Sequence, residues 1–214
     1  MRDKAWIDPD ECAECGVCQR SGICPQDAIL PGKLEWPRTL RETFSNPLAE
    51  HKATGVAGRG TEGIKTNDFT NRYRRGFMGV FIELGRPALG TRFADVEAVV
   101  KQFKSRGYSV VDDNPVAGLI ADPLTGALKP EILHEKAISV LVEFILPQSA
   151  VAELETILNE LAGDVETVFN VSIALRAGPD GASPIDNIFG PDTFRLPNGK
   201  VNLGMAEGIA GGEK

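Results

Sequence analysis

Four cysteines lie close together near the start of the chain, which contains no others. Cys12, Cys15, Cys18 and Cys24 give the spacing C-x2-C-x2-C-x5-C. A structural zinc site usually takes two separated cysteine pairs, whereas an unbroken C-x2-C-x2-C run suits an iron–sulfur cubane. Disulfides are rare in the cytoplasm, where thiols stay reduced. The spacing therefore favours an iron–sulfur cluster over zinc and over a disulfide.

Residues 5–31 resemble a bacterial-type ferredoxin motif, since Pro25 follows the last cysteine and short apolar segments flank the loop. The resemblance implies a [4Fe–4S] cluster. In such ferredoxins the last spacing has three residues, and the fourth cysteine serves another cluster. Here that spacing has five residues, and the two additional ones extend the reach by roughly 7 Å. We therefore expect one cubane bound by all four cysteines. A three-iron [3Fe–4S] cluster with Cys24 free, or a ligand from a partner chain, are the alternatives.

A second group of polar residues precedes the first long apolar run, in the segment KTNDFTNRYRRG at 65–76. Arginine suits carboxylates and phosphates because its planar guanidinium can donate two parallel hydrogen bonds. Polar residues are also normal on a solvated surface. Two interpretations stay open, a solvated loop and a contact with an anion or an acidic partner. The candidate residues for that contact are Lys65, Asn67, Asp68, Arg72, Arg74 and Arg75.

Residues 60–76 and the segment PNGKVNLG at 197–204 resemble parts of the bacterial 6-hydroxynicotinate reductase group and related ferredoxin-motif proteins. This resemblance implies a component of an anaerobic reductase that works beside a larger catalytic part. It assigns no catalytic residue to the chain.

The composition restricts the class of protein. The chain has 214 residues and a net charge of −7. Its length and its hydrophobic fraction of 42% are typical of a globular protein. The negative charge argues against binding nucleic acid by phosphate neutralisation. No apolar run approaches the roughly 20 residues that cross a bilayer, and the start lacks the apolar core of a signal peptide. We therefore expect a cytoplasmic protein that binds neither nucleic acid nor membrane.

Regular secondary structure is predicted from residue 77 onward, where apolar runs and helical stripes alternate. Strands are expected at 77–84, 108–111, 138–146 and 165–175, and helices at 91–107 and 149–163. Turn residues between Asp122 and Gly126 predict a hairpin inserted before the third strand. This order is that of the ferredoxin-like sandwich, an antiparallel sheet with two helices on one face. Such a sandwich carries no cluster by itself.

The sequence thus predicts an α+β protein, in which an N-terminal single-cluster iron–sulfur loop docks on a ferredoxin-like βαββαβ sandwich. Upstream of the sandwich, a short helix is expected around 38–44. The predicted parts are an iron–sulfur module at 1–31, an extended polar loop region at 32–76, the sandwich at 77–176 and a C-terminal arm at 177–214.

The leading functional hypothesis is an electron-transfer subunit that passes single electrons from the cluster to a partner reductase. Nothing in the sequence marks a flavin, nicotinamide or haem site. A reductase subunit, or a second copy of the chain, is the expected partner. Two alternatives stay open: a ligand-binding or redox-sensing regulatory protein with a structural cluster, and a subunit that contributes to the substrate site of an anaerobic reductase.

Overall fold

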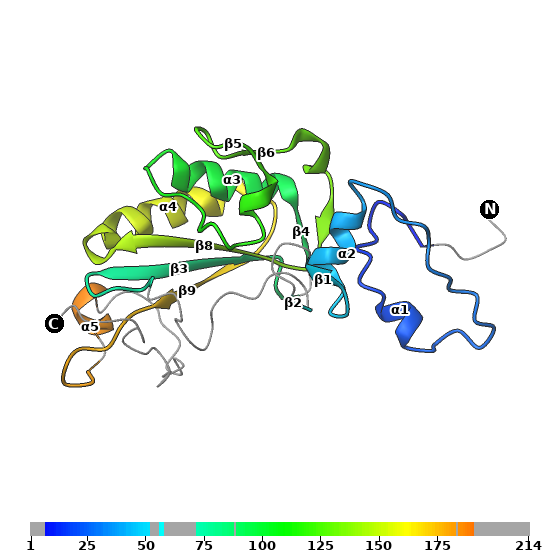
Figure 1. The fold of residues 1–214 in the computed structure, drawn as a ribbon, viewed down its shortest axis with the longest axis horizontal. Helices are drawn as coiled ribbons and strands as arrows, with labels where there is room; N and C mark the ends of the chain where they lie inside the picture. Colours follow the sequence, from blue (N-terminus) through cyan, green and yellow to red (C-terminus); the bar gives the residue numbers. More distant parts are fainter. Residues whose placement is uncertain (1–6, 52–55, 58–71, 88, 183, 191–214) are drawn as a thin grey trace.

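A three-stranded antiparallel sheet forms the centre of the protein, in the order β8–β3–β9. The computed structural model describes residues 7–51, 56–57, 72–87, 89–182 and 184–190. The strands of the sheet are β3 (Phe77–Leu84), β8 (Val140–Pro147) and β9 (Phe169–Ala174). β3 pairs with β8 over its whole length, and helices α3 (Phe93–Lys104) and α4 (Val151–Asp164) cover one face of the sheet (Figure 1). The chain is therefore an α+β protein, as predicted.

The main core lies between this sheet and the two helices. The helical stripes predicted from the sequence face it: Phe93, Val96, Val100 and Phe103 from α3, and Leu154, Ile157 and Leu161 from α4 are buried. The ring of Phe103 stacks on that of Phe144 in β8, with 3.9 Å between the ring centroids. Burying one such side chain contributes about 1.5–3 kcal/mol, so this layer stabilises the platform on which the cysteine segment rests.

The segment predicted as a strand at 108–111 makes one isolated antiparallel bridge, Val110 to Phe144, instead of a full strand. The chain turns away directly afterwards, because the side chain of Asn114 donates to the carbonyl of Leu141 and accepts from the amide of Val116. The predicted hairpin is present as β5 (Ile120–Asp122) and β6 (Ala127–Leu128), which pair antiparallel.

Short elements connect these layers to the N-terminal part. They are α1 (Val17–Arg20), α2 (Thr39–Ser45), β1 (Glu50–His51), β2 (Val56–Ala57), β4 (Thr91–Arg92), β7 (Lys136–Ala137) and α5 (Ile185–Ile188). Three 3-10 turns complete them: η1 (Ala117–Leu119), η2 (Pro130–Ile132) and η3 (Gln148–Ala150). Helix α2, predicted around 38–44, packs beside β7. In the described part of the chain, no helix is long and apolar enough to cross a membrane.

The opposite face of the sheet carries a second, smaller core formed by Tyr73, Phe81 and Leu141. The Tyr73 ring lies directly over Gly79 in β3, since a Cβ atom added at Gly79 would lie 2.4 Å from Cε1 of Tyr73. Real Cβ atoms do not approach other atoms so closely. Residue 79 has to be glycine for Tyr73 to pack there.

Gly79→Ala is therefore expected to lower the free energy of unfolding by about 1–3 kcal/mol, the usual cost of overpacking. Urea denaturation measures this difference. Gly118→Ala is the matched control, because a Cβ atom at Gly118 would meet nothing within 4 Å, and it should change the free energy by less than about 0.5 kcal/mol. Equal effects of the two substitutions would contradict the packing of Tyr73 on Gly79.

Candidate metal centre

The segment with the cysteines, residues 8–31, is called the cysteine loop below. It projects beyond α2 at one end of the central sheet (Figure 1). The sheet and the two helices that cover it are called the sandwich, without regard to fold family. All four thiols are half-buried and none forms a disulfide. Cys18 lies in α1, Cys12 and Cys15 precede this helix, and Cys24 follows it.

The backbone of the cysteine loop is wound tightly. Glu14 and Asp27 have φ angles of 54° and 48°, and Gly16 and Gly22 have 66° and 61°. Glycine adopts such angles without a steric penalty, whereas a residue with a Cβ atom pays of order 1–3 kcal/mol. The conformation at Glu14 and Asp27 therefore has to be held by other contacts.

Arg41 on α2 makes several contacts with the entry of the cysteine loop. Its side chain is buried, and Nη1 lies 3.0 Å from the carbonyl oxygen of Pro9 and 2.9 Å from those of Asp10 and Cys12. Nε donates to the carboxylate of Glu135, which precedes β7. A buried charge is tolerated only when it is paired and hydrogen-bonded. Arg41 satisfies this condition by joining the entry of the cysteine loop to the sandwich.

Two further side chains bind carbonyl groups of the cysteine residues. Arg20 donates from Nη2 to the carbonyl of Cys15 at 2.8 Å and from Nη1 to Oδ1 of Asn46 at 2.9 Å. The hydroxyl of Ser21 donates to the carbonyl of Cys18 at 2.9 Å. Together with Arg41, these contacts tie the carbonyls of three of the four cysteines to side chains of the protein.

Ion pairs add to the docking of the loop. Arg38 on the cap of α2 lies 2.5 Å from the carboxylate of Glu14. Glu11 pairs with Lys136 and, at 3.4 Å, with Arg92. The hydrogen bond from Lys136 is the main cause that holds the pKa of Glu11 below its ordinary value. Glu11 is largely exposed, so salt screens its pairs and they contribute little.

The thiols differ in their electrostatic surroundings. Burial raises the pKa of Cys12, although the backbone amide of Glu14 acts in the opposite direction. Backbone amides lower the pKa of Cys24, above all that of Ala28, whose nitrogen lies 3.3 Å from Sγ. The thiolate is the form that binds metal, and hydrogen bonds to sulfur tune iron–sulfur clusters. The amide hydrogen bonds at Cys24 therefore favour its thiolate and suit ligation of a cluster, whereas burial of Cys12 acts against the thiolate form.

The donor set therefore fits an iron–sulfur cluster in its chemistry: four thiols, amides directed at sulfur, and carbonyls bound elsewhere. The four thiols, however, do not form a complete binding geometry. Within the described residues, no three Cys, His, Asp or Glu side chains converge into a set that could hold a metal ion.

Arg72, one of the residues predicted to contact an anion or a partner, is engaged inside the protein. Its Nη1 donates to Oε1 of Glu143 at 3.0 Å, and Nη2 pairs with Asp113. The hydroxyl of Tyr73 donates to the same Oε1 at 2.5 Å. Glu143 is only 3% exposed, so its carboxylate needs a charged partner. The guanidinium of Arg72 thus serves two carboxylates of this chain, and its contact with an anion or a partner stays a prediction.

These contacts set the pKa values of the two carboxylates in opposite directions. Burial raises the pKa of Glu143, and the hydrogen bonds from Tyr73 and Arg72 reduce this effect. The hydrogen bond from Arg72 lowers the pKa of Asp113, which lies nearer the surface. Glu143 is thus the group of this cluster that burial brings closest to neutrality.

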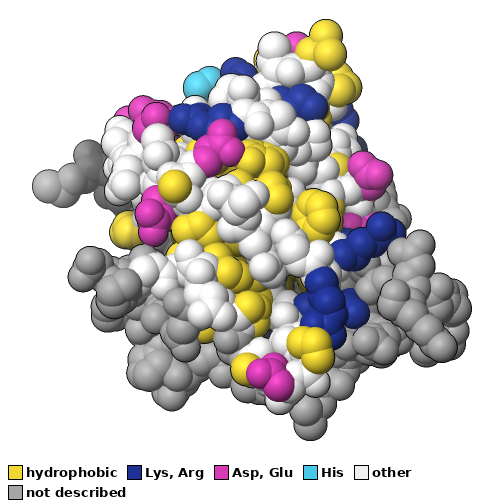
Figure 2. Space-filling view, turned by 90° about the vertical axis from the view of Figure 1, so that its left-hand side faces the viewer, with side chains coloured by type: hydrophobic (Ala, Val, Ile, Leu, Met, Phe, Trp, Pro, Cys, Tyr) yellow, Lys and Arg dark blue, Asp and Glu magenta, His cyan; other side chains and the backbone are white. Residues whose placement is uncertain are grey.

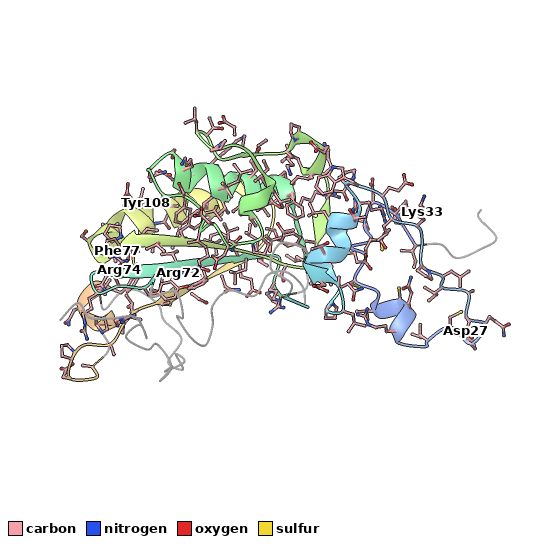
Figure 3. The ribbon with its side chains drawn as sticks, in the orientation of Figure 1. Asp27, Lys33, Arg72, Arg74, Phe77 and Tyr108 are labelled. Carbon is pink, nitrogen blue, oxygen red and sulfur yellow. The ribbon has the colours of Figure 1, made fainter. Side chains whose placement is uncertain are left out.

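The neighbouring arginines remain on the surface. Arg74 and Arg75 are exposed, and Nη1 of Arg75 donates to the carbonyl of Ala177 at 3.3 Å. Figure 2 shows basic side chains beside hydrophobic ones on this end of the molecule. Figure 3 places Arg74 and Phe77 here, and it places Asp27 of the cysteine loop and the nearby Lys33 at the other end. The structure therefore does not unite these arginines with the cysteines.

The remaining predicted contact residues, Lys65, Asn67 and Asp68, lie outside the described residues. So do most of the segments on which the second family resemblance depends, residues 60–71 and 197–204. Of the predicted C-terminal arm, the structure describes residues 177–182 and 184–190.

Sequence reasoning missed Arg41 and Glu135. Arg41 stands in the short polar segment TLRETFS, which resembles a solvated helix. A signal was present nevertheless, because positions 40, 41, 44 and 45 form one stripe at helical spacing. All four are buried in the structure, so an arginine in that stripe required a partner.

No family model, curated protein or solved structure gives a significant match to the chain.

Proposed function

We propose that the cysteine loop binds one [4Fe–4S] cluster through Cys12, Cys15, Cys18 and Cys24, and that the protein is an electron-transfer subunit of a reductase. The run C-x2-C-x2-C-x5-C-P carries this proposal. A cluster of this kind supplies one-electron chemistry, and its potential depends on hydrogen bonds to sulfur and on exposure.

The residues of the loop have two roles in this proposal. Side chains bind the carbonyls of Cys12, Cys15 and Cys18 and so direct them away from a bound cluster. The amide of Ala28 stabilises the thiolate of Cys24. For all four sulfur atoms to share one cubane, they have to come closer together, because no three Cys, His, Asp or Glu side chains of the described residues converge. If Cys24 does not join the other three cysteines, these would hold a three-iron cluster.

The strand arrangement supports a ferredoxin-like sandwich as the platform. β9, β3 and β8 are neighbours in this order, and Val110 bridges to Phe144 on the outer edge of β8. If the segment of Val110 counts as a reduced strand, the order is that of a βαββαβ unit, with both helices on one face. We assign this platform the role of holding the cysteine loop and presenting it to the partner.

Anaerobic purification followed by iron, sulfide and zinc analysis tests the proposal. We expect brown protein with about four irons and four sulfides per chain, the content of one cubane. About three irons would support the three-iron alternative. Stoichiometric zinc without visible absorbance would contradict the proposal.

Copurification tests the subunit role separately. An electron-transfer subunit should bring a larger reductase component with it from its native cells. A loaded protein that binds no such component and exchanges no electrons with one would contradict the subunit role and leave the regulatory alternative.

A further inference from the structure

We propose that Arg41 is a positioning residue of the cluster site: from the sandwich, it fixes the turn that carries Cys12 before a cluster is bound. The role rests on the proposed cluster function, but the anchoring itself concerns only residues of this chain.

The two sets of partners of Arg41 come from distant parts of the sequence. On one side are the carbonyls of Pro9, Asp10 and Cys12, and on the other the carboxylate of Glu135, which is 94 positions away. The charge of Glu135 allows the guanidinium to be buried, and the planar group then holds its donors in fixed directions. One side chain thus fixes the turn that carries the first cysteine relative to Glu135 and the strand that follows it.

The other ion pairs between the loop and the rest of the protein are more exposed, since the side chains of Arg38 and Glu14 are 30% and 18% exposed. Glu11, which pairs with Lys136 and Arg92, has a side chain that is 61% exposed. The side chains of Arg41 and Glu135 are 4% and 12% exposed. Exposed pairs contribute at most about 1 kcal/mol, whereas breaking a buried pair is strongly destabilising. Arg41 is therefore expected to dominate the anchoring.

At the other end of the cysteine loop, Cys24 is held by hydrogen bonds within its own turn. The carbonyl of Cys24 accepts from the amide of Asp27 at 3.1 Å, and its sulfur accepts from Ala28, both within the same turn. The neighbouring Ile23 is 75% exposed. The backbone turn that carries Cys12 is thus fixed before the cluster binds, whereas the sulfur atoms take their final positions when it binds.

Arg41→Lys tests this role, because lysine keeps the charge but has a single ammonium group that cannot serve the three carbonyls and Glu135 together. Iron-free protein is digested with thermolysin, and cleavage within residues 8–31 is followed by mass spectrometry. We expect cleavage at least about fivefold faster than in the iron-free wild type. In loaded protein, we expect iron loss to a chelator at least about tenfold faster.

Arg106→Lys is the matched control, since Arg106 pairs with Glu160 at 2.5 Å on the helical layer of the sandwich. It should leave both rates unchanged. Wild-type rates in a folded Arg41→Lys protein would overturn the proposal. Absence of iron from the wild type would instead contradict the cluster function, and the digestion of iron-free protein would still test the anchoring.

Glu135→Gln separates positioning of the cluster from general stability. Glutamine keeps the shape and an acceptor oxygen, but it leaves the charge of Arg41 uncompensated near the cluster. A positive charge favours the reduced form, so the reduction potential should shift to a more positive value. An unchanged potential in a loaded, folded variant would show that Arg41 does not lie close to the cluster, which contradicts the proposed role.

Discussion

Cys15→Ser is expected to reduce the iron content of anaerobically prepared protein from about four atoms to fewer than about one per chain. Cys15 is the middle ligand of the C-x2-C-x2-C run, and its carbonyl is already fixed by Arg20. A serine hydroxyl does not ionise as a thiol does, so it cannot replace the thiolate ligand. Iron analysis and visible absorbance measure the loss, while circular dichroism should show an unchanged sandwich.

Two companion variants sharpen this experiment. Ser21→Ala removes only the hydrogen bond to the carbonyl of Cys18 and should retain most of the iron. Cys24→Ser should leave about three irons or fewer if Cys24 is the fourth ligand. Wild-type iron content in Cys24→Ser would point to a site with three cysteines, and wild-type content in Cys15→Ser would contradict a cluster in this loop.

Arg72→Met is expected to destabilise the fold by about 3–5 kcal/mol at pH 7, the cost of leaving a buried partner charge unpaired. The charge in question is Glu143, which keeps only its hydrogen bond from Tyr73 among the contacts described here. Arg74→Met is the matched control, because Arg74 is exposed, and it should cost less than about 0.5 kcal/mol. Urea unfolding of both variants measures the difference, and equal effects would contradict the burial of this ion pair.

The cost of Arg72→Met should also depend on pH. Glu143 has a raised pKa, so its contribution to stability is present below its ordinary pKa of 4.5 and is lost as the pH rises through the raised value. Without Arg72, this pKa rises further. Asp113 has a lowered pKa through Arg72, so its contribution is present at neutral pH and is lost at low pH. The effect at Glu143 makes the substitution more costly at pH 7 than at pH 4.5, whereas the contribution of Asp113 is lost only below its ordinary pKa of 3.8. A cost independent of pH would contradict this account.

The strongest apolar patterns were sufficient to predict the central elements. The run at 77–84 is the strand β3, from its first to its last residue, because a continuous apolar segment is typical of a strand covered on both faces. The alternation around Val140 and Phe144 identified the residues of β8 that face the helices. It did not reveal that Leu141 and Glu143 are buried too, since Tyr73, which covers this face, comes from a segment that reads as polar.

For the site, the sequence predicted the four cysteines as ligands but not the residues that contact their backbone. Cysteine spacing is a local property, so it can be read directly. The roles of Arg41 and Arg72 depend on carboxylates 94 and 71 positions away, and no local pattern contains that information. The prediction of a full strand at 108–111 was wrong for a similar reason. The turn at Asn114 is fixed by the carbonyl of a distant residue on β8, which no local pattern shows.

The length of β3 has a consequence for the arrangement of partners. Its eight residues span about 26 Å, and this strand runs from the end that carries Arg74 and Phe77 toward the end that carries the cysteine loop (Figure 3). A compact protein that covers the cysteine loop would therefore leave Arg74 and Arg75 open to solvent. If a partner binds the cysteine loop as proposed, the end of the sheet that carries Arg74 and Phe77 is a separate surface, and the sheet separates the two along its length (Figure 3).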